Sequence, residues 1–174
     1  PPSQAYEEIA EKLRTLVRPL LFLFRLNKIT YSYDSQQGYY KKARDEKFDT
    51  SSLVATRYKL SQKIPGGTIL SEKLWLFSRQ DTEEHRYSVG FFLDEYGKLK
   101  PVSEPAFCFF QTKVQTGLNF IVNAPFWLTD SREGIRAGVP HNIRMIDNLA
   151  TLAADSLVGI KSIGKKEGKR LIDD

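Results

Sequence analysis

The chain has 174 residues, of which 41% are hydrophobic and 27% charged, and its formal net charge is +5 at pH 7. This length suits one domain, or one domain with a small appendage, and the composition is ordinary for a soluble globular protein. The modest charge fits an anionic ligand but lacks the dense basic stripe typical of nucleic-acid binding. The longest apolar run, residues 19–24, is far shorter than the roughly 20 residues that cross a bilayer, so we expect no membrane partner.

The chain contains one cysteine, Cys108, flanked by Phe107, Phe109 and Phe110. It cannot form an intrachain disulfide, and its neighbours predict a buried structural thiol. A reducing compartment is therefore favoured, and we expect a cytoplasmic protein. The amino end carries acidic residues where a signal peptide would carry basic ones, and the absence of a first methionine suggests a segment of a longer protein.

The amino-terminal part predicts a helix and a hairpin. Residues 3–18 have helical spacing, and their apolar face would comprise Ile9, Leu13, Leu16 and Leu20. Residues 28–33 alternate apolar and polar side chains, and 34–38 form the expected turn before a second strand. The polar segment 41–52 is expected to be a loop.

The middle of the chain predicts a sheet. Residues 54–60 and 74–77 have strand periodicity, and 86–93 with 98–102 form the clearest hairpin. Residues 106–110 and 118–128 are almost continuously apolar, which predicts central strands covered on both faces.

The last third changes to helical spacing. A helical stripe contains Ile143, Ile146, Ala150, Ala153 and Leu157, and Leu149 and Leu152 widen it. Gly159 is placed where the helix would end, and residues 161–174 are expected to be a basic tail or a linker to a further domain. The order of elements predicts an α+β fold with a mixed, largely antiparallel sheet and flanking helices.

Several common catalytic sites are absent from the sequence. His85 and His141 lie far apart with no flanking ligand pattern, so we expect no metal site. No glycine-rich phosphate loop followed by lysine, nucleophile elbow or dinucleotide fingerprint is present. A complete small enzyme is therefore the least favoured interpretation.

Two polar segments follow apolar ones and could bind an anion. Residues 111–117 are rich in hydroxyl, amide and ammonium donors, although composition alone favours a polar hairpin connection there. In the second segment, Asp130 and Glu133 have the spacing of a capping box, which would place Ser131 and Arg132 in the first turn of a helix. Such an arginine suits a phosphate, but a structural ion pair for Arg132 and a surface position for Arg136 are equally favoured by the residues alone.

Residues 124–133, Ala-Pro-Phe-Trp-Leu-Thr-Asp-Ser-Arg-Glu, resemble the catalytic loop of the middle domain of the ninety-kilodalton heat-shock chaperone. A closer resemblance is to the post-ATPase segment of sacsin-like GHKL ATPases. It covers residues 106–157 most specifically and is carried by Phe107 to Phe110, Gln111-Thr112, Thr116-Gly117-Leu118, Phe120, Ser131-Arg132-Glu133 and Asn142. The resemblance implies that residues 1–160 form a transducer-like middle domain with ribosomal-protein domain 2-like layers.

By this resemblance Arg132 would act as an arginine finger in cis, contacting the terminal phosphate of ATP. Lys113 is a second candidate because Gln111-Thr112-Lys113 is similar to the phosphate-sensing loop of the gyrase B subunit. Arg136 is a third, since it falls where the chaperone loop has a functional glutamine. Gln111, Thr112 and Ser131 would contribute cofactor contacts.

The resemblance also implies partners. ATP and Mg would be bound only by a separate, N-terminal GHKL ATP-binding domain of the same parent protein, because the motifs for magnesium, adenine and the ATP lid are absent here. We expect the chain alone to bind no cofactor and to hydrolyse no ATP. The parent could act on a client protein or nucleic acid, and it could form a homodimer.

The alternative is a non-enzymatic module that binds nucleic acid or protein. Exposed tyrosines of residues 31–40 would stack on bases, and a basic tail would meet phosphates through Lys161, Lys165, Lys166, Lys169 and Arg170. A solubilising tail and tyrosines belonging to a sheet face are favoured over this interpretation.

Overall fold

The computed structural model describes residues 2–33, 36–50, 53–81, 83, 85–168 and 171. The helices are α1 (Pro2–Thr15) and α2 (Pro140–Glu167). The strands are β1 (Lys28–Tyr33), β2 (Gln36–Asp49), β3 (Val54–Lys63), β4 (Ile69–Gln80), β5 (Arg86–Leu93), β6 (Leu99–Lys100), β7 (Pro105–Cys108), β8 (Phe110–Gln115) and β9 (Ile121–Asn123). No helix within these described ranges is long and apolar enough to span a membrane.

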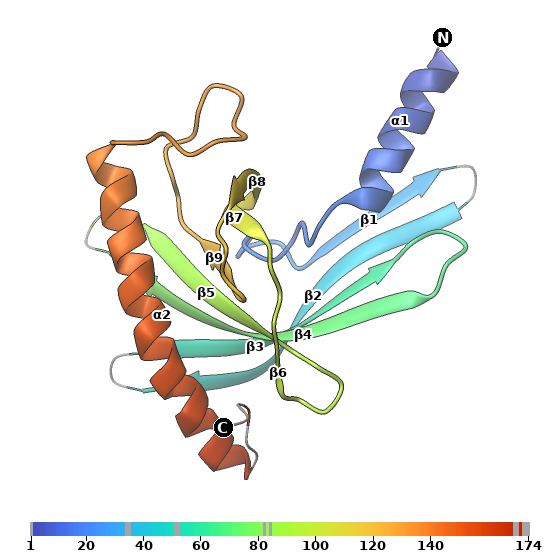
Figure 1. Cartoon of the computed structure of the whole chain (residues 1–174). Helices are drawn as coiled ribbons and strands as arrows, with labels where there is room; N and C mark the ends of the chain where they lie inside the picture. The colour runs from blue at the N-terminus through green and yellow to red at the C-terminus, as the bar shows by residue number, and fades with distance from the viewer. Residues whose placement is uncertain are drawn as a thin grey trace. The chain divides into compact units, whose positions relative to one another are not determined.

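The fold class is α+β, as the sequence predicts (Figure 1). Within the described residues nine strands form one sheet in the order β1-β2-β3-β4-β5-β9-β7-β8, with β6 paired to β5. The neighbouring strands are mostly antiparallel, and β7 and β9 are parallel. The expected hairpin of β5 and β6 is confirmed.

The chain divides into two compact units. Unit 1 comprises Pro1–Ala43 and Lys59–Glu72, and unit 2 comprises Arg44–Tyr58 and Lys73–Asp174. All the candidate site residues belong to unit 2.

In unit 1 the expected apolar face of residues 3–18 is wrong for Ile9 and Leu16, whereas Leu20 of that face is buried but lies beyond the end of α1. Ile9 is 59% exposed and Ala10 is the buried residue, because the helix ends at Thr15 and the burial is achieved by the segment after it, through Leu20, Leu21 and Phe22. The second strand of the hairpin contains Tyr40, which is buried and donates its hydroxyl hydrogen to the Leu13 carbonyl at 2.6 Å. The expectation that the tyrosines of residues 31–40 are exposed is therefore wrong for Tyr40.

The expectation of a loop at residues 41–52 is wrong for residues 41–49, because β2 continues to Asp49, and residues 51 and 52 lie outside the described residues. Its charged side chains are used in the sheet: within unit 2, Arg57 of β3 forms ion pairs with Asp45 and Glu46 of β2, each at 2.9 Å. In unit 1 the Lys42 side chain is only 3% exposed and donates to the Leu23 carbonyl at 2.9 Å. The charged composition of this segment suggested a loop, because composition alone does not show which charged side chains find partners within a sheet.

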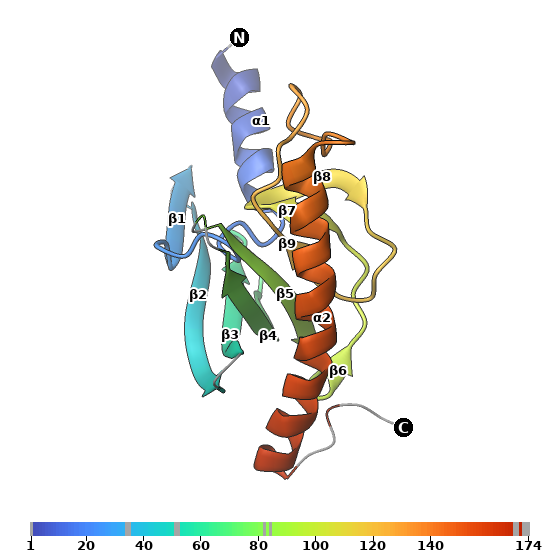
Figure 2. The same cartoon turned by 90° about the vertical axis from the view of Figure 1, so that its left-hand side faces the viewer.

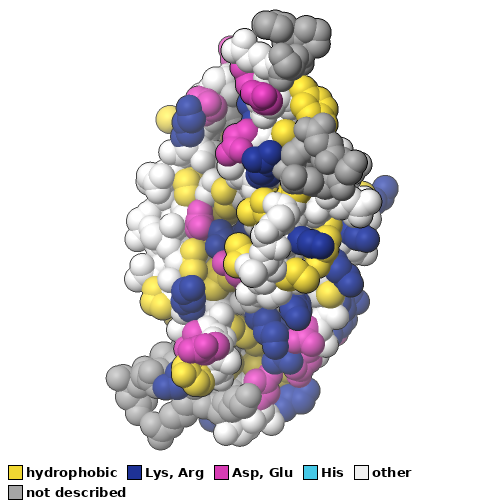
Figure 3. All heavy atoms as spheres, turned by 90° about the vertical axis from the view of Figure 1, so that its right-hand side faces the viewer, with side chains coloured by type: hydrophobic (Ala, Val, Ile, Leu, Met, Phe, Trp, Pro, Cys, Tyr) yellow, Lys and Arg dark blue, Asp and Glu magenta, His cyan; other side chains and the backbone are white. Residues whose placement is uncertain are grey.

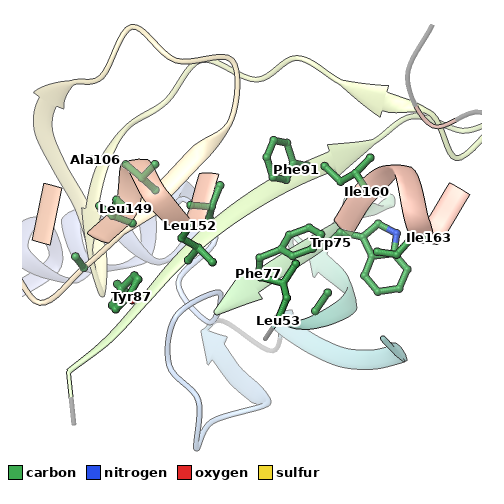
Figure 4. Close-up of a cluster of buried hydrophobic side chains, with 14 of the residues drawn as sticks. Leu53, Trp75, Phe77, Tyr87, Phe91, Ala106, Leu149, Leu152, Ile160 and Ile163 are labelled. Carbon is green, nitrogen blue, oxygen red and sulfur yellow. The ribbon is translucent and has the colours of Figure 1, made fainter. Parts of the chain in front are cut away.

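Unit 2 has its core between α2 and one face of the sheet (Figure 4). Trp75 and Phe77 point from β4 into this cluster at the period of two that a strand imposes. They meet Leu152 and Ile160 of α2, and each such fully buried side chain stabilises the fold by about 1.5–3 kcal/mol. Phe91 of β5 packs edge-on against Phe77, with ring centroids 5.9 Å apart.

The expected stripe of α2 is wrong in part, and the expected helix end is wrong. Of the stripe, Leu149 and Leu152 are buried and Ala153 packs against the core, whereas Ile143, Ile146 and Leu157 are about half exposed. The helix also passes through Gly159, where a Cβ would lie 2.7 Å from Leu53 and 2.8 Å from Phe77. That glycine therefore marks a close approach to the core rather than a helix end.

The helix ends at Glu167, and Gly168, with φ +64, provides the left-handed cap. Residues 161–167, expected in the basic tail, are thus its last two turns. Lys169 and Arg170 lie outside the described residues. Lys166 lies 5.8 Å from the centre of the Phe48 ring.

The strands next to the candidate site are shorter than expected. Residues 118–128 contain only β9, which lies between β5 and β7. The expected connection at 111–117 is instead mostly β8, since the hairpin turns at Phe109, whose φ is +64 and whose N–H donates to the Asn123 side chain at 2.9 Å. Cys108 is half-buried, donates to the Phe126 carbonyl, and has its pKa raised by burial.

Candidate functional site

The segment that carries Arg132 is a closed loop and not the start of a helix. An isolated antiparallel bridge joins Leu128 to Ile135, and inside it the Thr129 N–H donates to the Gly134 carbonyl at 2.8 Å. The expected capping box is therefore wrong, and α2 begins only at Pro140. The chain closes on itself through Thr129 before helical hydrogen bonds can form, so Arg132 is not at a helix terminus.

Arg132 lies at the tip of this loop in a left-handed conformation, with φ +59. A residue with a Cβ pays about 1–2 kcal/mol for that geometry. The backbone N–H of Arg132 donates to the Thr129 carbonyl at 2.8 Å, which fixes the tip. Its side chain is exposed and makes no hydrogen bond or ion pair with any residue that the structure describes.

The structure brings Lys113 to the same loop. The Lys113 N–H, on β8, donates to the Glu133 carbonyl at 2.8 Å, and the Lys113 ammonium pairs with the Glu133 carboxylate at 2.8 Å. This strand lies at the end of the described sheet order, so the loop extends its edge. The Lys113 side chain is 75% exposed, and an ion pair so exposed contributes only about 0–1 kcal/mol.

Arg136 is a structural residue of the loop. Its guanidinium donates to the Leu128 carbonyl at 2.8 Å and pairs with Asp130 at 2.7 Å. Its backbone N–H donates to the Trp127 carbonyl at 3.0 Å. These bonds hold the two sides of the loop together, so the Arg136 guanidinium is less available to an outside anion than that of Arg132.

The other three candidates are already engaged in hydrogen bonds. Thr112 is buried and donates its hydroxyl hydrogen to the Ala106 carbonyl at 2.7 Å. Gln111 donates its amide to Glu104 at 2.5 Å. The Ser131 hydroxyl lies 3.1 Å from that of Thr129 and accepts from the Glu133 N–H at 3.4 Å. These contacts orient the edge strand and the loop.

Asn142 is a positioning residue whose role the sequence did not predict. Its side chain is 2% exposed. Its Oδ1 accepts the Trp127 N–H at 2.8 Å, while its Nδ2 donates to the carbonyls of Trp127 and Arg136 at 3.0 and 2.8 Å. One amide thus ties both ends of the loop to the first turn of α2. Only the resemblance pointed to it.

The two histidines, distant in sequence, are neighbours beside this loop. The rings of His85 and His141 have centroids 5.0 Å apart, and the exposed Trp127 ring stacks on His141 at 5.5 Å. Asp81 accepts the N–H groups of Glu83 and His85. Burial raises the pKa of the Asp81 carboxyl, but these hydrogen bonds and the His85 ring outweigh burial and hold it below its ordinary value. Among the described side chains, no group of three His, Cys, Asp or Glu residues is arranged to hold a metal ion.

The residues that the alternative module would use belong to different parts of the chain. On the face drawn in Figure 3, Lys and Arg side chains lie among Asp and Glu side chains. The tyrosines of residues 31–40 belong to unit 1, and the lysines of α2 belong to unit 2. Tyr31 packs against the buried Tyr40, with ring centroids 6.1 Å apart, so a base could not reach between these two rings.

Comparison with known proteins finds one similarity to report. Protein NO VEIN of Arabidopsis thaliana is 31% identical to this chain over 152 residues, which cover 79% of the chain and 5% of that protein. The chain therefore corresponds to a small part of a far longer relative. No family model and no solved structure matches the chain.

Proposed function

We propose that this chain is the transducer or middle domain of a chaperone-like GHKL ATPase. It would offer Arg132 in cis to the terminal phosphate of an ATP molecule held, with Mg, by a separate ATP-binding domain, and it would relay the nucleotide state to the parent protein. The observation that carries the proposal is the exposed Arg132 guanidinium, which has no partner among the described residues while most polar groups around it have one.

The geometry of the loop supports this role. A group that stabilises charge in a transition state is most effective when its backbone is fixed before the ligand arrives. Here Asn142 and Arg136 tie the loop at its base, and the Thr129 carbonyl fixes the Arg132 N–H at its tip. The guanidinium at this fixed tip is then free to meet an outside oxyanion, since it has no partner among the described residues.

Lys113 supports the same interpretation in a secondary role. Its ammonium is paired with Glu133 beside the Arg132 tip, in an exposed and therefore weak ion pair. A phosphate brought to the loop could replace the Glu133 carboxylate as its partner. Lys113 would then report whether the terminal phosphate is present, and Glu133 would keep the ammonium in place in its absence.

Because the ATP site and the arginine would belong to different domains, hydrolysis would require the two domains to close on each other. ATP and Mg would be bound by the other domain, and this chain would contribute an arginine only when the two meet. Arginine fingers in such reactions raise turnover by about 10³–10⁵. A rigid loop that completes a site in another domain couples that closure to hydrolysis.

The test uses a protein that joins this chain to the region encoded directly before it in its gene. That region should contain the asparagine-bearing helix, the Asp-x-Gly-x-Gly motif and the glycine-rich lid, and the joined protein should hydrolyse ATP faster than that region alone. Lys113→Ala should lower turnover less than Arg132→Ala does. An unrelated preceding region, or equal turnover with and without this chain, would refute the proposal.

A further inference from the structure

The outward face of α2 carries a second apolar stripe that no described residue covers. In Figure 2 the helix lies in front of β5. Ile143 is 51% exposed, Leu157 47% and Val158 66%, and Ala150 and Ala154 between them are exposed as well. A helix whose only partner is its own core would place polar side chains at these positions.

The stripe has the spacing of a helix-pairing seam. We define the outer seam as Ile143, Asp147, Ala150, Ala154, Leu157, Val158, Lys161 and Lys165. Apart from the adjacent Leu157 and Val158, its members follow one another at steps of three and four residues, which keep one side of a helix facing a partner over several turns, here for about 33 Å. The alanines at its centre allow another helix to approach closely.

The charges of the outer seam are self-complementary. Asp147 lies seven residues before Ala154, and Lys161 lies seven residues after it. Neither side chain forms an ion pair with any residue in the described part of the chain. If two copies of the seam meet antiparallel about a twofold axis at Ala154, each Asp147 faces the Lys161 of the other copy.

The same arrangement matches the uncharged positions. Ala150 faces Val158, a small residue against a large one, and the aliphatic stem of Lys165 covers Ile143. A parallel pairing in register would instead place Asp147 against Asp147 and Lys161 against Lys161. The seam therefore favours one orientation and one kind of occupant, a second copy of itself.

We propose that two copies of this chain associate through an antiparallel pairing of their α2 helices along the outer seam. The interface is isologous and does not involve the Arg132 loop, so it is independent of the proposed function. A single helix pair lies at the small end of specific interfaces, and the dimer is accordingly weak and dependent on concentration.

The first test is sedimentation equilibrium of the 174-residue chain from about 10 µM to 1 mM, where weak interfaces of this kind dissociate. A reversible monomer–dimer equilibrium is expected. Ala154→Glu places two carboxylates face to face on the twofold axis and should leave only monomer, with the circular dichroism and melting temperature of the parent chain, because the position is exposed and glutamate favours helix.

The second test fixes the register by exchanging charges. Asp147→Lys and Lys161→Asp should each weaken the dimer about tenfold, because two attractive contacts become repulsive. The double variant should return to within about threefold of the parent, since both contacts are restored. Asn148→Lys, one position off the seam, is the matched control and should leave the equilibrium unchanged.

Three results would overturn the proposal: a chain that stays monomeric over this range, a dimer that Ala154→Glu does not disturb, or a double variant no stronger than the single ones. A complex with another protein through the seam, without self-association, would equally exclude the second copy as the occupant.

Discussion

Asn142 joins the two ends of the Arg132 loop through its side-chain amide. Replacing it with alanine leaves the Trp127 N–H and the Arg136 carbonyl without their partner. Unpaired groups of this kind cost about 1–3 kcal/mol, so Asn142→Ala should lower the free energy of unfolding by that amount in denaturant titrations. Asn142→Asp should be at least as damaging, because a carboxylate oxygen would face two carbonyls.

Asn148 provides the control on the same helix. Its side chain makes no contact of this type with the described residues, so Asn148→Ala should change the free energy of unfolding by less than about 0.5 kcal/mol. Equal effects at positions 142 and 148 would mean that the amide does not hold the loop.

Lys42 predicts a pH dependence of stability. Burial lowers the pKa of its ammonium from 10.5 to about 8. As pH rises above 8 the folded chain loses this proton while the unfolded chain keeps it, so the unfolded state binds more protons and stability increases toward pH 10.5. Between pH 7.5 and 9.5 the parent chain should gain about 2 kcal/mol relative to Lys42→Met, which cannot titrate.

The measurement is the free energy of unfolding of both chains at the two pH values. Lys41→Met supplies the comparison, because it removes an exposed lysine of the same strand and leaves Lys42 in place. Tyr40, whose pKa burial raises to about 12, contributes equally to all three chains and cancels in the differences. A parent chain and Lys42→Met with parallel profiles would contradict the prediction.

At the scale of the element, α2 depends on Gly159 for its approach to the sheet. Alanine normally stabilises a helix by about 1 kcal/mol relative to glycine. Here the added Cβ would press on Leu53 and Phe77, both buried, so Gly159→Ala should instead lower the free energy of unfolding by about 1–3 kcal/mol.

The matched variant is Ala154→Gly at an exposed position of the same helix. It should lose about 1 kcal/mol from helix propensity alone, which separates that effect from packing. A higher free energy of unfolding for Gly159→Ala would show that Leu53 and Phe77 can move to accommodate the added Cβ, and would contradict the prediction.

The same helix shows which features could be predicted from the spacing of apolar residues. Its existence and approximate position follow from the spacing of apolar residues, but the expected stripe combines both sides of the helix, because Leu149 and Leu152 are buried whereas Ile143 and Leu157 are about half exposed. Periodicity cannot tell which of two stripes meets the sheet. The helix end expected at Gly159 is wrong for a related reason. The sequence does not distinguish a glycine that allows close packing from a glycine that ends a helix.

The Arg132 loop shows how much of the candidate site could be predicted from the sequence. The resemblance drew attention to Lys113, Arg132 and Asn142 together, and the structure places all three around one loop. The capping-box spacing of Asp130 and Glu133 predicted a helix that is absent, since these carboxylates pair with Arg136 and Lys113 instead. The spacing of residues within a short segment cannot predict ion pairs of this kind.

At the scale of the whole molecule, an α+β fold and a largely antiparallel sheet follow from the alternation of strands between terminal helices. The division into two units does not follow, because β2, β3 and β4 each contribute residues to both. The proposed function also requires an ATP-binding domain that is not in this chain. The central claim of that proposal is that Arg132 acts on a nucleotide bound by the other domain.

Single-turnover ATP hydrolysis by the joined protein tests that claim most directly, with Arg132→Ala compared with the parent and with Arg25→Ala, an exposed arginine outside the loop. The Arg132→Ala rate should fall about 10³-fold or more, with ATP affinity changed only a few-fold, because the arginine acts on the transferred phosphoryl group. Arg25→Ala should retain the parent rate. An Arg132→Ala protein that hydrolyses ATP as fast as the parent would contradict the arginine-finger role.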